Sequence, residues 1–304
     1  MPATQFQPGL VHAPVTPFTS DGRLDFTTYE KLIEFHIRNG ADALALPMHV
    51  GESVSLPDEE KRRLISFAVE RARGRIPIIA HVSDAGTAIA AALARHAETA
   101  GAAAVVATTP YYWTPPPTMI LEHFAQIGGA VKIPFLVHNN PDDMAGVRVS
   151  AELMLKLMER LDNFAGLIDA SLDWQFMIAL MTEACRRRPA FCLLAGTEHL
   201  VSAGTIGASG MVSTLAAVAP RSVRRLYDLC RAKKYVEARP VQGEVAALRQ
   251  ALAKADVAHL KTALRIAGRD CGAPRPPLRA LDQGASDALA GRLGPLLADE
   301  PRGW

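Results

Sequence analysis

Residues 164–171, FAGLIDAS, form a short apolar segment that ends at a carboxylate, Asp169. The apolar residues are continuous rather than alternating, which is typical of a strand buried on both faces of a parallel sheet. Seven other segments have the same character: LVHAPV (10–15), ALALPM (43–48), IPIIAHV (76–82), AAVVATT (103–109), IPFLVH (133–138), AFCLLA (190–195) and ASGMVST (208–214). Helical patterns such as 26–40 and 87–101, each closed by a glycine, separate most of them. Eight strands alternating with helices predict an α/β fold, a (β/α)8 TIM barrel.

The last third of the chain has a different pattern. After Pro220 the apolar periodicity is purely helical, through SVRRLYDLCRAKKY, VQGEVAALRQALAKA and VAHLKTALRIAG. We therefore predict a barrel over residues 1–220 and a C-terminal helical domain over 221–304. A short helix around His199–Ala203 fits between the last two strands, and the tail should hold one more short helix and a frayed end.

Bulk composition excludes several classes of protein. The chain has 304 residues, 49% of them hydrophobic, so it can bury a large core. A net charge of +2 does not indicate the basic surface that binds nucleic acid. No apolar run is long enough to span a membrane. The start, MPATQFQPGL, lacks the pattern of a signal peptide, and the four cysteines are scattered without disulfide spacing. These features predict a cytoplasmic protein with no nucleic-acid or membrane partner.

In barrels of this kind the active site is built at the C-terminal ends of the strands. Three histidines fall at those ends: His49, His81 and His138. Neutral imidazoles can exchange protons near pH 7, so one interpretation is acid–base catalysis. The alternative for His49 and His138 is a pair of partly buried histidines bonded to backbone. A zinc site with Glu198 as a fourth ligand is less favoured because the spacing matches no known motif, and we expect no metal and no other cofactor.

The ordered set of strand ends resembles the dihydrodipicolinate synthase / N-acetylneuraminate lyase family. The matching segments are APVTPFTSDGRLD (13–25), GE (51–52), TTPYY (108–112), HNNP (138–141), GLIDAS (166–171), AGTE (195–198), GASGMVSTLAAVAP (207–220) and HLKTALRIAG (259–268). The resemblance implies a homotetramer or homodimer of barrels that acts on a small-molecule substrate. It also implies cleavage or formation of a C–C bond next to pyruvate, or dehydration of a sugar acid, through a lysine Schiff base.

The departures from the family pattern are as informative as the matches. Ile168 occupies the position of the Schiff-base lysine, and His138 that of a tyrosine that relays protons. His49 and Val50 replace two threonines that seat the substrate carboxylate, and Asp143 takes the place of an arginine. An isoleucine cannot form an iminium, so we expect class I aldolase chemistry to be absent.

The resemblance places the remaining candidate residues. We expect His49, His138 and Tyr112 to be catalytic, with Tyr112 reaching a neighbouring subunit's site or packing at an interface. His81 replaces a family glycine and either faces ligand or fills space. The expected substrate-binding residues are His81, Val50, Ile168, Asn139 and Glu198, although Glu198 is also placed to cap the helix that follows.

Two functions remain open. The first is a lyase that acts on a small carboxylate or keto acid by histidine acid–base chemistry. The second is an inactive family member that binds small molecules or serves as a scaffold. Asp169 is less informative than its neighbour, since alternation along a strand turns adjacent side chains to opposite faces. We expect Asp169 to brace the loop at Ser171, a role in the site being the alternative.

Overall fold

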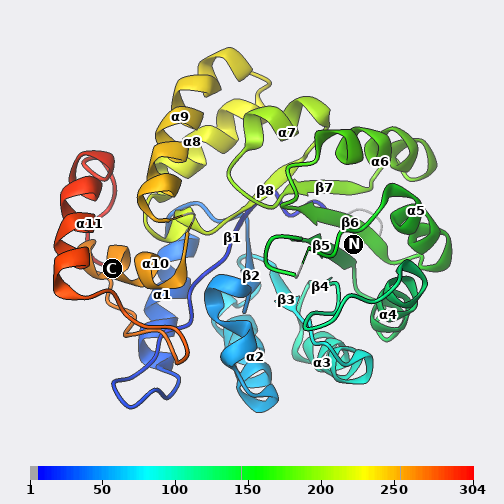
Figure 1. The fold of residues 1–304 in the computed structure, drawn as a ribbon, viewed down its shortest axis with the longest axis horizontal. Coiled ribbons are helices and arrows are strands. Elements are labelled where there is room, and N and C mark those ends of the chain that lie inside the picture. Colours follow the sequence, from blue (N-terminus) through cyan, green and yellow to red (C-terminus); the bar gives the residue numbers. More distant parts are fainter. Residues whose placement is uncertain (1–5, 145, 254) are drawn as a thin grey trace.

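The strands of the protein close into one parallel barrel. The computed structural model describes residues 6–144, 146–253 and 255–304. The strands pair in sequence order and β8 closes the ring on β1 (Figure 1). They are β1 (Leu10–His12), β2 (Ala43–Leu46), β3 (Ile78–His81), β4 (Ala104–Thr108), β5 (Phe135–Asn139), β6 (Phe164–Asp169), β7 (Cys192–Ala195) and β8 (Gly210–Ser213). The predicted TIM barrel is therefore confirmed.

Helices surround this ring of strands. They are α1 (Phe26–Arg38), α2 (Asp58–Ala72), α3 (Thr87–Ala100), α4 (Pro117–Gly129), α5 (Ala151–Arg160), α6 (Trp174–Arg187), α7 (Leu200–Ile206) and α8 (Pro220–Arg231). The described residues also form three 3-10 turns: η2 (His49–Gly51), η3 (Ser53–Ser55) and η4 (Leu215–Ala217). None of the described helices is both long and apolar enough to cross a membrane.

Local signals in the sequence set the ends of these helices. The carboxylate of Asp25 accepts a hydrogen bond from the backbone N–H of Thr28 and so caps the start of α1. At the C-terminal end of α3, the backbone N–H of Gly101 donates to the carbonyls of Ala97 and Glu98. Gly101 has φ +94°, a conformation that glycine adopts without a steric cost. Each βα unit can thus start and stop at a defined residue.

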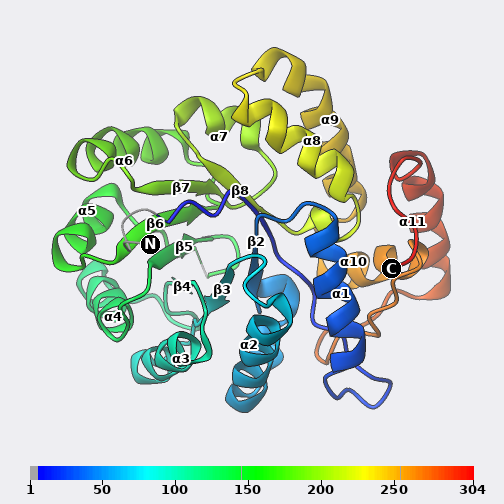
Figure 2. The ribbon, with the colours of Figure 1, turned by 180° about the vertical axis from the view of Figure 1, so that it is seen from behind.

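Three helices follow α8 and pack beside the barrel. They are α9 (Tyr235–Ala251), α10 (Val257–Ile266) and α11 (Gln283–Leu296), and both views show α10 and α11 near α1 (Figures 1 and 2). The helix α8 itself packs against β8. The division of the chain at residue 220 stays a prediction.

The C-terminal tail is anchored rather than frayed, which corrects the sequence expectation. Arg269 is fully buried, and its guanidinium donates to the carbonyls of Pro301 and Gly303 and to those of Ala217 and Val218. It also lies over the ring of Phe35, 4.1 Å from the ring centroid. One buried cation therefore ties the tail to the barrel.

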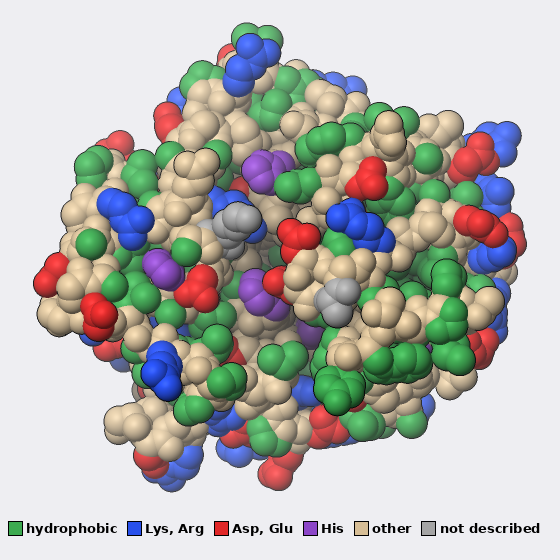
Figure 3. Space-filling model, viewed as in Figure 1, with side chains coloured by type: hydrophobic (Ala, Val, Ile, Leu, Met, Phe, Trp, Pro, Cys, Tyr) green, Lys and Arg blue, Asp and Glu red, His purple; other side chains and the backbone are tan. Residues whose placement is uncertain are grey.

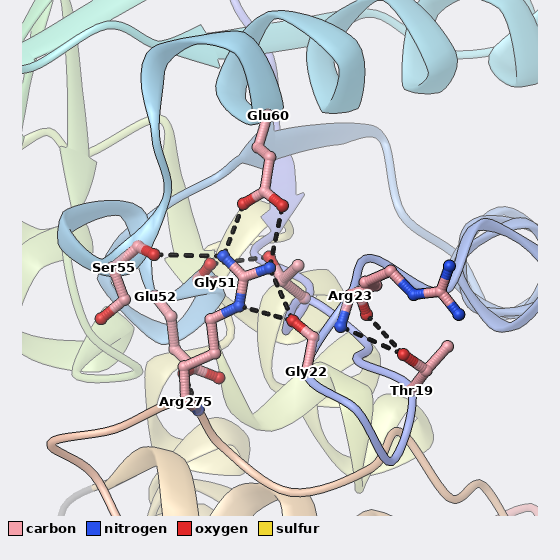
Figure 4. A network of polar contacts seen from close by, with 9 residues as sticks. Thr19, Gly22, Arg23, Gly51, Glu52, Ser55, Glu60 and Arg275 are labelled. Carbon is pink, nitrogen blue, oxygen red and sulfur yellow. Dashed lines mark hydrogen bonds and ion pairs between the residues drawn. The ribbon is translucent and has the colours of Figure 1, made fainter.

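A second polar cluster joins the loop after β2 to the segment after α10. The backbone N–H of Arg275 donates to Glu52, and its guanidinium donates to Glu60 and to the carbonyls of Gly22 and Ser55 (Figure 4). Lys261 on α10 places its Nζ 2.7 Å from Glu52 Oε1, and both side chains are almost fully buried. Charges from two distant parts of the sequence thus compensate one another with little exposure to water.

We predict that Lys261→Met destabilises the protein, because it leaves the Glu52 carboxylate buried without its cation. Loss of one partner of a buried ion pair costs about 3–5 kcal/mol of unfolding free energy. Chemical denaturation measures this loss. The Glu52→Gln/Lys261→Met double variant removes both charges and should recover most of the stability; equal losses in the single and double variants would contradict the account.

The core also holds a pair of histidines in contact. The Nδ1 atoms of His12 on β1 and His36 on α1 are 3.0 Å apart, and neither side chain is exposed. Burial lowers the pKa of His12 well below its usual value and that of His36 to about 3. Both imidazoles are therefore neutral in the folded protein at neutral pH, and one must donate to the other.

This pair predicts how stability depends on pH. The folded-state pKa values lie below the unfolded value of about 6.5, so the stabilisation is present above pH ~6.5 and is lost as the pH falls. Each histidine contributes a slope of up to about 1.4 kcal/mol per pH unit. Denaturation between pH 7.5 and 5 should show a shallower slope for His12→Leu/His36→Leu than for wild type, and identical slopes would refute the prediction.

Candidate active site

A cavity of about 540 Å³ opens where the strands end on the C-terminal side of the barrel. Histidine and acidic side chains gather around the hollow near the centre of this face (Figure 3). Its polar lining comes from β5, from the loops after β2, β5, β7 and β8, and from α9 and the residues after it: His49, His138, Asn140, Asp142, Asp143, Thr197, His199, Thr214, Arg249, Gln250 and Asp256. His49 and His138, two of the predicted catalytic residues, therefore line the same cavity.

His138 lies deepest among these groups. It stands near the end of β5, with Ile168 of β6 as its register partner, and its side chain is almost wholly buried. Burial lowers its pKa to about 4, with nearby His49 as the second cause. Its Nδ1 is buried and has no hydrogen-bond partner among the described residues. A neutral imidazole with one unpartnered nitrogen therefore belongs to the cavity lining at neutral pH.

His49 is the accessible member of the pair. It begins the turn η2, and about half of its side chain is exposed. Its Nε2 lies 4.0 Å from Asp143 Oδ2, and that carboxylate also accepts a hydrogen bond from Asn140. This separation is too long for a hydrogen bond, and both side chains are almost half exposed.

His81 does not line the cavity. Its Nε2 is 2.8 Å from Ser83 Oγ, which accepts a hydrogen bond from the backbone N–H of Thr108. Burial lowers the pKa of His81 to about 3, and His138 is the second cause. The side chain is buried and is not part of the cavity lining, so of the two expected roles the geometry favours the space-filling one.

No lysine lines the cavity in the part of the chain that the structure describes. Ile168 is fully buried between His138 of β5 and Leu194 of β7, and Val50 in η2 is also fully buried. These two residues, expected to bind substrate, therefore lie beneath the cavity surface. Ala253 and Ala255 line the cavity, and Lys254 between them lies outside the described residues.

Asn139 turns away from the site, which corrects its expected role in substrate binding. Its Nδ2 donates to Asp169 Oδ1, and its Oδ1 accepts from the backbone N–H of Val149. Since adjacent side chains of a strand face opposite ways, His138 facing inward turns Asn139 outward. Asp169 also accepts from Ser171 Oγ, so the expectation that it braces this loop is confirmed.

Glu198 is a structural carboxylate, which corrects both expected roles. Its side chain is 2% exposed and does not line the cavity. One oxygen accepts from Ser213 Oγ and from the N–H groups of Thr214 and Leu215, so it caps η4 after β8 and not the helix after β7. The other oxygen binds Arg249 at 2.9 Å.

Tyr112 lies outside this cavity. It is 97% exposed in the single chain and has φ +84°, an uncommon conformation for a residue with a side chain. The neighbouring Trp113 is about half exposed. Tyr112 does not contact the site of its own chain, and its contact with a neighbouring subunit stays a prediction.

Several lining residues were missed by the sequence analysis. Arg249 lies on α9, and the helical pattern alone does not indicate that this helix borders the barrel mouth. Gln242 on the same helix donates to the carbonyl of Glu198. His199 and Thr214 were visible as residues just beyond strands. Burial lowers the pKa of His199, and the charge of Arg249 adds to this effect.

The donor atoms do not form a metal centre within the described ranges. No group of three His, Cys, Asp or Glu side chains there is arranged to hold a metal ion. The geometric reason is visible at His81, whose ring is bonded to Ser83 beneath the surface that His49 and His138 line. The four cysteines carry no disulfide.

Comparisons with known proteins agree with this architecture. The dihydrodipicolinate synthetase family matches residues 7–294. The 4-hydroxy-tetrahydrodipicolinate synthase of Azoarcus sp. (strain BH72) is 33% identical over 92% of this chain and 95% of its own, and that of Clostridium perfringens (strain SM101 / Type A) is 31% identical over 87% and 89%.

Solved structures show the same relationship. Dihydrodipicolinate synthase from Aquifex aeolicus superposes with a TM-score of 0.89 at 30% identity, covering 95% of this chain and 98% of that one. YagE, a prophage protein of the dihydrodipicolinic acid synthase family from E. coli K12 solved in complex with pyruvate, has a TM-score of 0.89 at 25% identity with the same coverage. The chain belongs to the dihydrodipicolinate synthetase family.

Proposed function

We propose that this protein is a lyase that acts on a small keto acid by histidine acid–base catalysis without a Schiff base. The observation that carries the proposal is the open cavity, which holds His49 and His138 at its wall while isoleucine stands in the lysine position. An abandoned site would be expected to close as apolar side chains filled it. The open, polar cavity therefore favours an enzyme over a scaffold.

The two histidines suit different steps. His49 is accessible and lies near the Asp143 carboxylate, which would stabilise the imidazolium that forms when His49 takes a proton from the carbon next to the substrate carbonyl. The bonding electrons then move onto the carbonyl oxygen. His138 is neutral, as its lowered pKa requires, and would donate a hydrogen bond to that oxygen as its negative charge develops.

The pyruvate bound to YagE makes pyruvate a suitable probe of this chemistry. We predict that the protein catalyses exchange of the methyl protons of pyruvate in D₂O, followed as loss of the methyl signal by proton NMR. His49→Asn should slow exchange by about 10²–10⁴-fold, the usual contribution of a general base. His138→Phe should also slow it, since the oxyanion loses its donor.

The control is His96→Gln. His96 lies on α3 beside Ser66, outside the cavity, so its replacement should leave the exchange rate unchanged. Absence of exchange in the wild-type protein, or an unchanged rate in His49→Asn, would contradict the proposed function.

We also propose that the exposed face around the β4–α4 loop contacts a second copy of the chain and delivers Tyr112 to the neighbouring site. Tyr112, Trp113 and Met119 expose large apolar surfaces there. Isolated exposed apolar residues are common, but a group of them on one face is typical of an interface. The resemblance to a family of homo-oligomers also supports a contact between subunits.

Charges placed on this face should separate the subunits. We predict that Tyr112→Glu/Trp113→Glu lowers the mass of the assembly measured by analytical ultracentrifugation. Val236→Glu is the matched control, since Val236 is an exposed apolar residue on α9, away from this loop. An unchanged mass in the double variant would exclude this face as the interface.

A further inference from the structure

We infer that Arg249 and Thr214 form a carboxylate-binding subsite, and that the substrate is a keto acid longer than pyruvate with a second carboxylate at its far end. This inference rests on the proposed function, because it assumes that the keto group lies at His49 and His138. The proposed subsite lies in the part of the cavity formed by the end of β8, the β7–α7 loop and α9. The acid–base chemistry proposed for His49 and His138 does not use this part.

Arg249 is the only permanent cation among the described residues that line the cavity. Its side chain is 22% exposed, and Nη1 donates to Glu198 at 2.9 Å. The other guanidinium N–H groups have no protein acceptor within the described residues. A planar guanidinium held by one edge thus keeps donors available for a carboxylate.

The Arg249–Glu198 pair is net neutral, but Glu198 occupies only one edge of the guanidinium. Its carboxylate is itself held by donors from Ser213, Thr214 and Leu215. The pair is therefore a rigid support that fixes the position of the guanidinium. Rigid support of this kind is what a precise anion subsite needs.

Thr214 supplies an independent indication of a ligand. Its Oγ1 is buried and has no hydrogen-bond partner among the described residues, although the residue lines the cavity. A buried hydroxyl without a partner is costly, so such atoms call for a bound group. The Thr214 N–H and the Arg249 guanidinium bind the two oxygens of one carboxylate, so these two cavity-lining residues are neighbours.

The acidic side chains set the orientation of the ligand. Asp142 and Asp143 line the cavity from the loop after β5, so this side disfavours a second negative charge in addition to the carboxylate next to the keto group. Asp256 also lines it, but its carboxylate caps α10 by accepting from Ala258 and His259. The distal carboxylate is therefore directed to Arg249, away from the β5 loop.

The cavity size favours a long substrate. Pyruvate would leave much of the 540 Å³ empty, whereas ligand pockets are generally well filled by their ligands. A keto acid with a second carboxylate can place its carbonyl at His138 and its far end at Arg249 in the same cavity.

The test compares two probes of equal length by isothermal titration calorimetry. One is 2-oxoglutarate, and the other is 2-oxopentanoate, which lacks the distal carboxylate. We expect 2-oxoglutarate to bind the wild-type protein roughly 10- to 100-fold more tightly, the range for a charge-assisted hydrogen bond. The Glu198→Gln/Arg249→Gln variant removes both charges but keeps the hydrogen bond, and should abolish the difference.

Thr214→Val separates ligand binding from support of the fold. It removes the hydroxyl but leaves the Arg249–Glu198 pair and the backbone N–H in place, so it should weaken 2-oxoglutarate alone. The thermal midpoint without ligand should stay the same or rise, because a buried hydroxyl without a partner is lost. Equal binding of the two probes by the wild type, or a preference that survives in the double variant, would overturn the subsite while leaving keto-acid binding intact. Failure of both probes to bind would overturn the subsite and count against the proposed function as well.

Discussion

The closed ring of parallel strands is the constraint on which the rest of this protein depends. It brings all eight strand ends to one face and forces adjacent side chains of every strand to point in opposite directions. His138 therefore faces the cavity while Asn139, its neighbour, bonds outward to Asp169. The same rule makes Ile168 the inward residue of β6. Which residue can take part in chemistry is thus decided by register before it is decided by residue type.

Buried charge determines how the rest of the chain attaches to this ring. Lys261 and Arg275 bring the segment around α10 to Glu52, Arg269 ties down the tail, and Arg249 holds α9 to Glu198. Each carboxylate in these contacts follows a strand whose end borders the cavity mouth. The C-terminal helices therefore do more than cover the barrel, since α9 completes the cavity wall with Arg249.

Much of the fold and part of the site could be predicted from the sequence. Continuous apolar runs at regular spacing are enough to indicate a parallel barrel, and His49 and His138 followed from their positions at strand ends. Asn139 was misplaced because the alternation applied to Asp169 was not applied one strand earlier. Glu198 and Arg249 could not be placed, because their contact joins residues 51 positions apart across a helix packing that no local pattern records. The tail was expected to fray because its composition gives no sign of the buried Arg269 that holds it.

The central claim is that this family member works without the lysine electrophile. The resemblance to the family places Ile168 at the position of that lysine, and no described lysine lines the cavity. The most direct measurement is the intact mass of the wild-type protein after incubation with pyruvate and sodium borohydride, with Ile168→Lys run in parallel. The account predicts an unchanged wild-type mass. A reduced pyruvyl adduct on the wild-type chain, mapped to Lys254 or any other lysine, would contradict it.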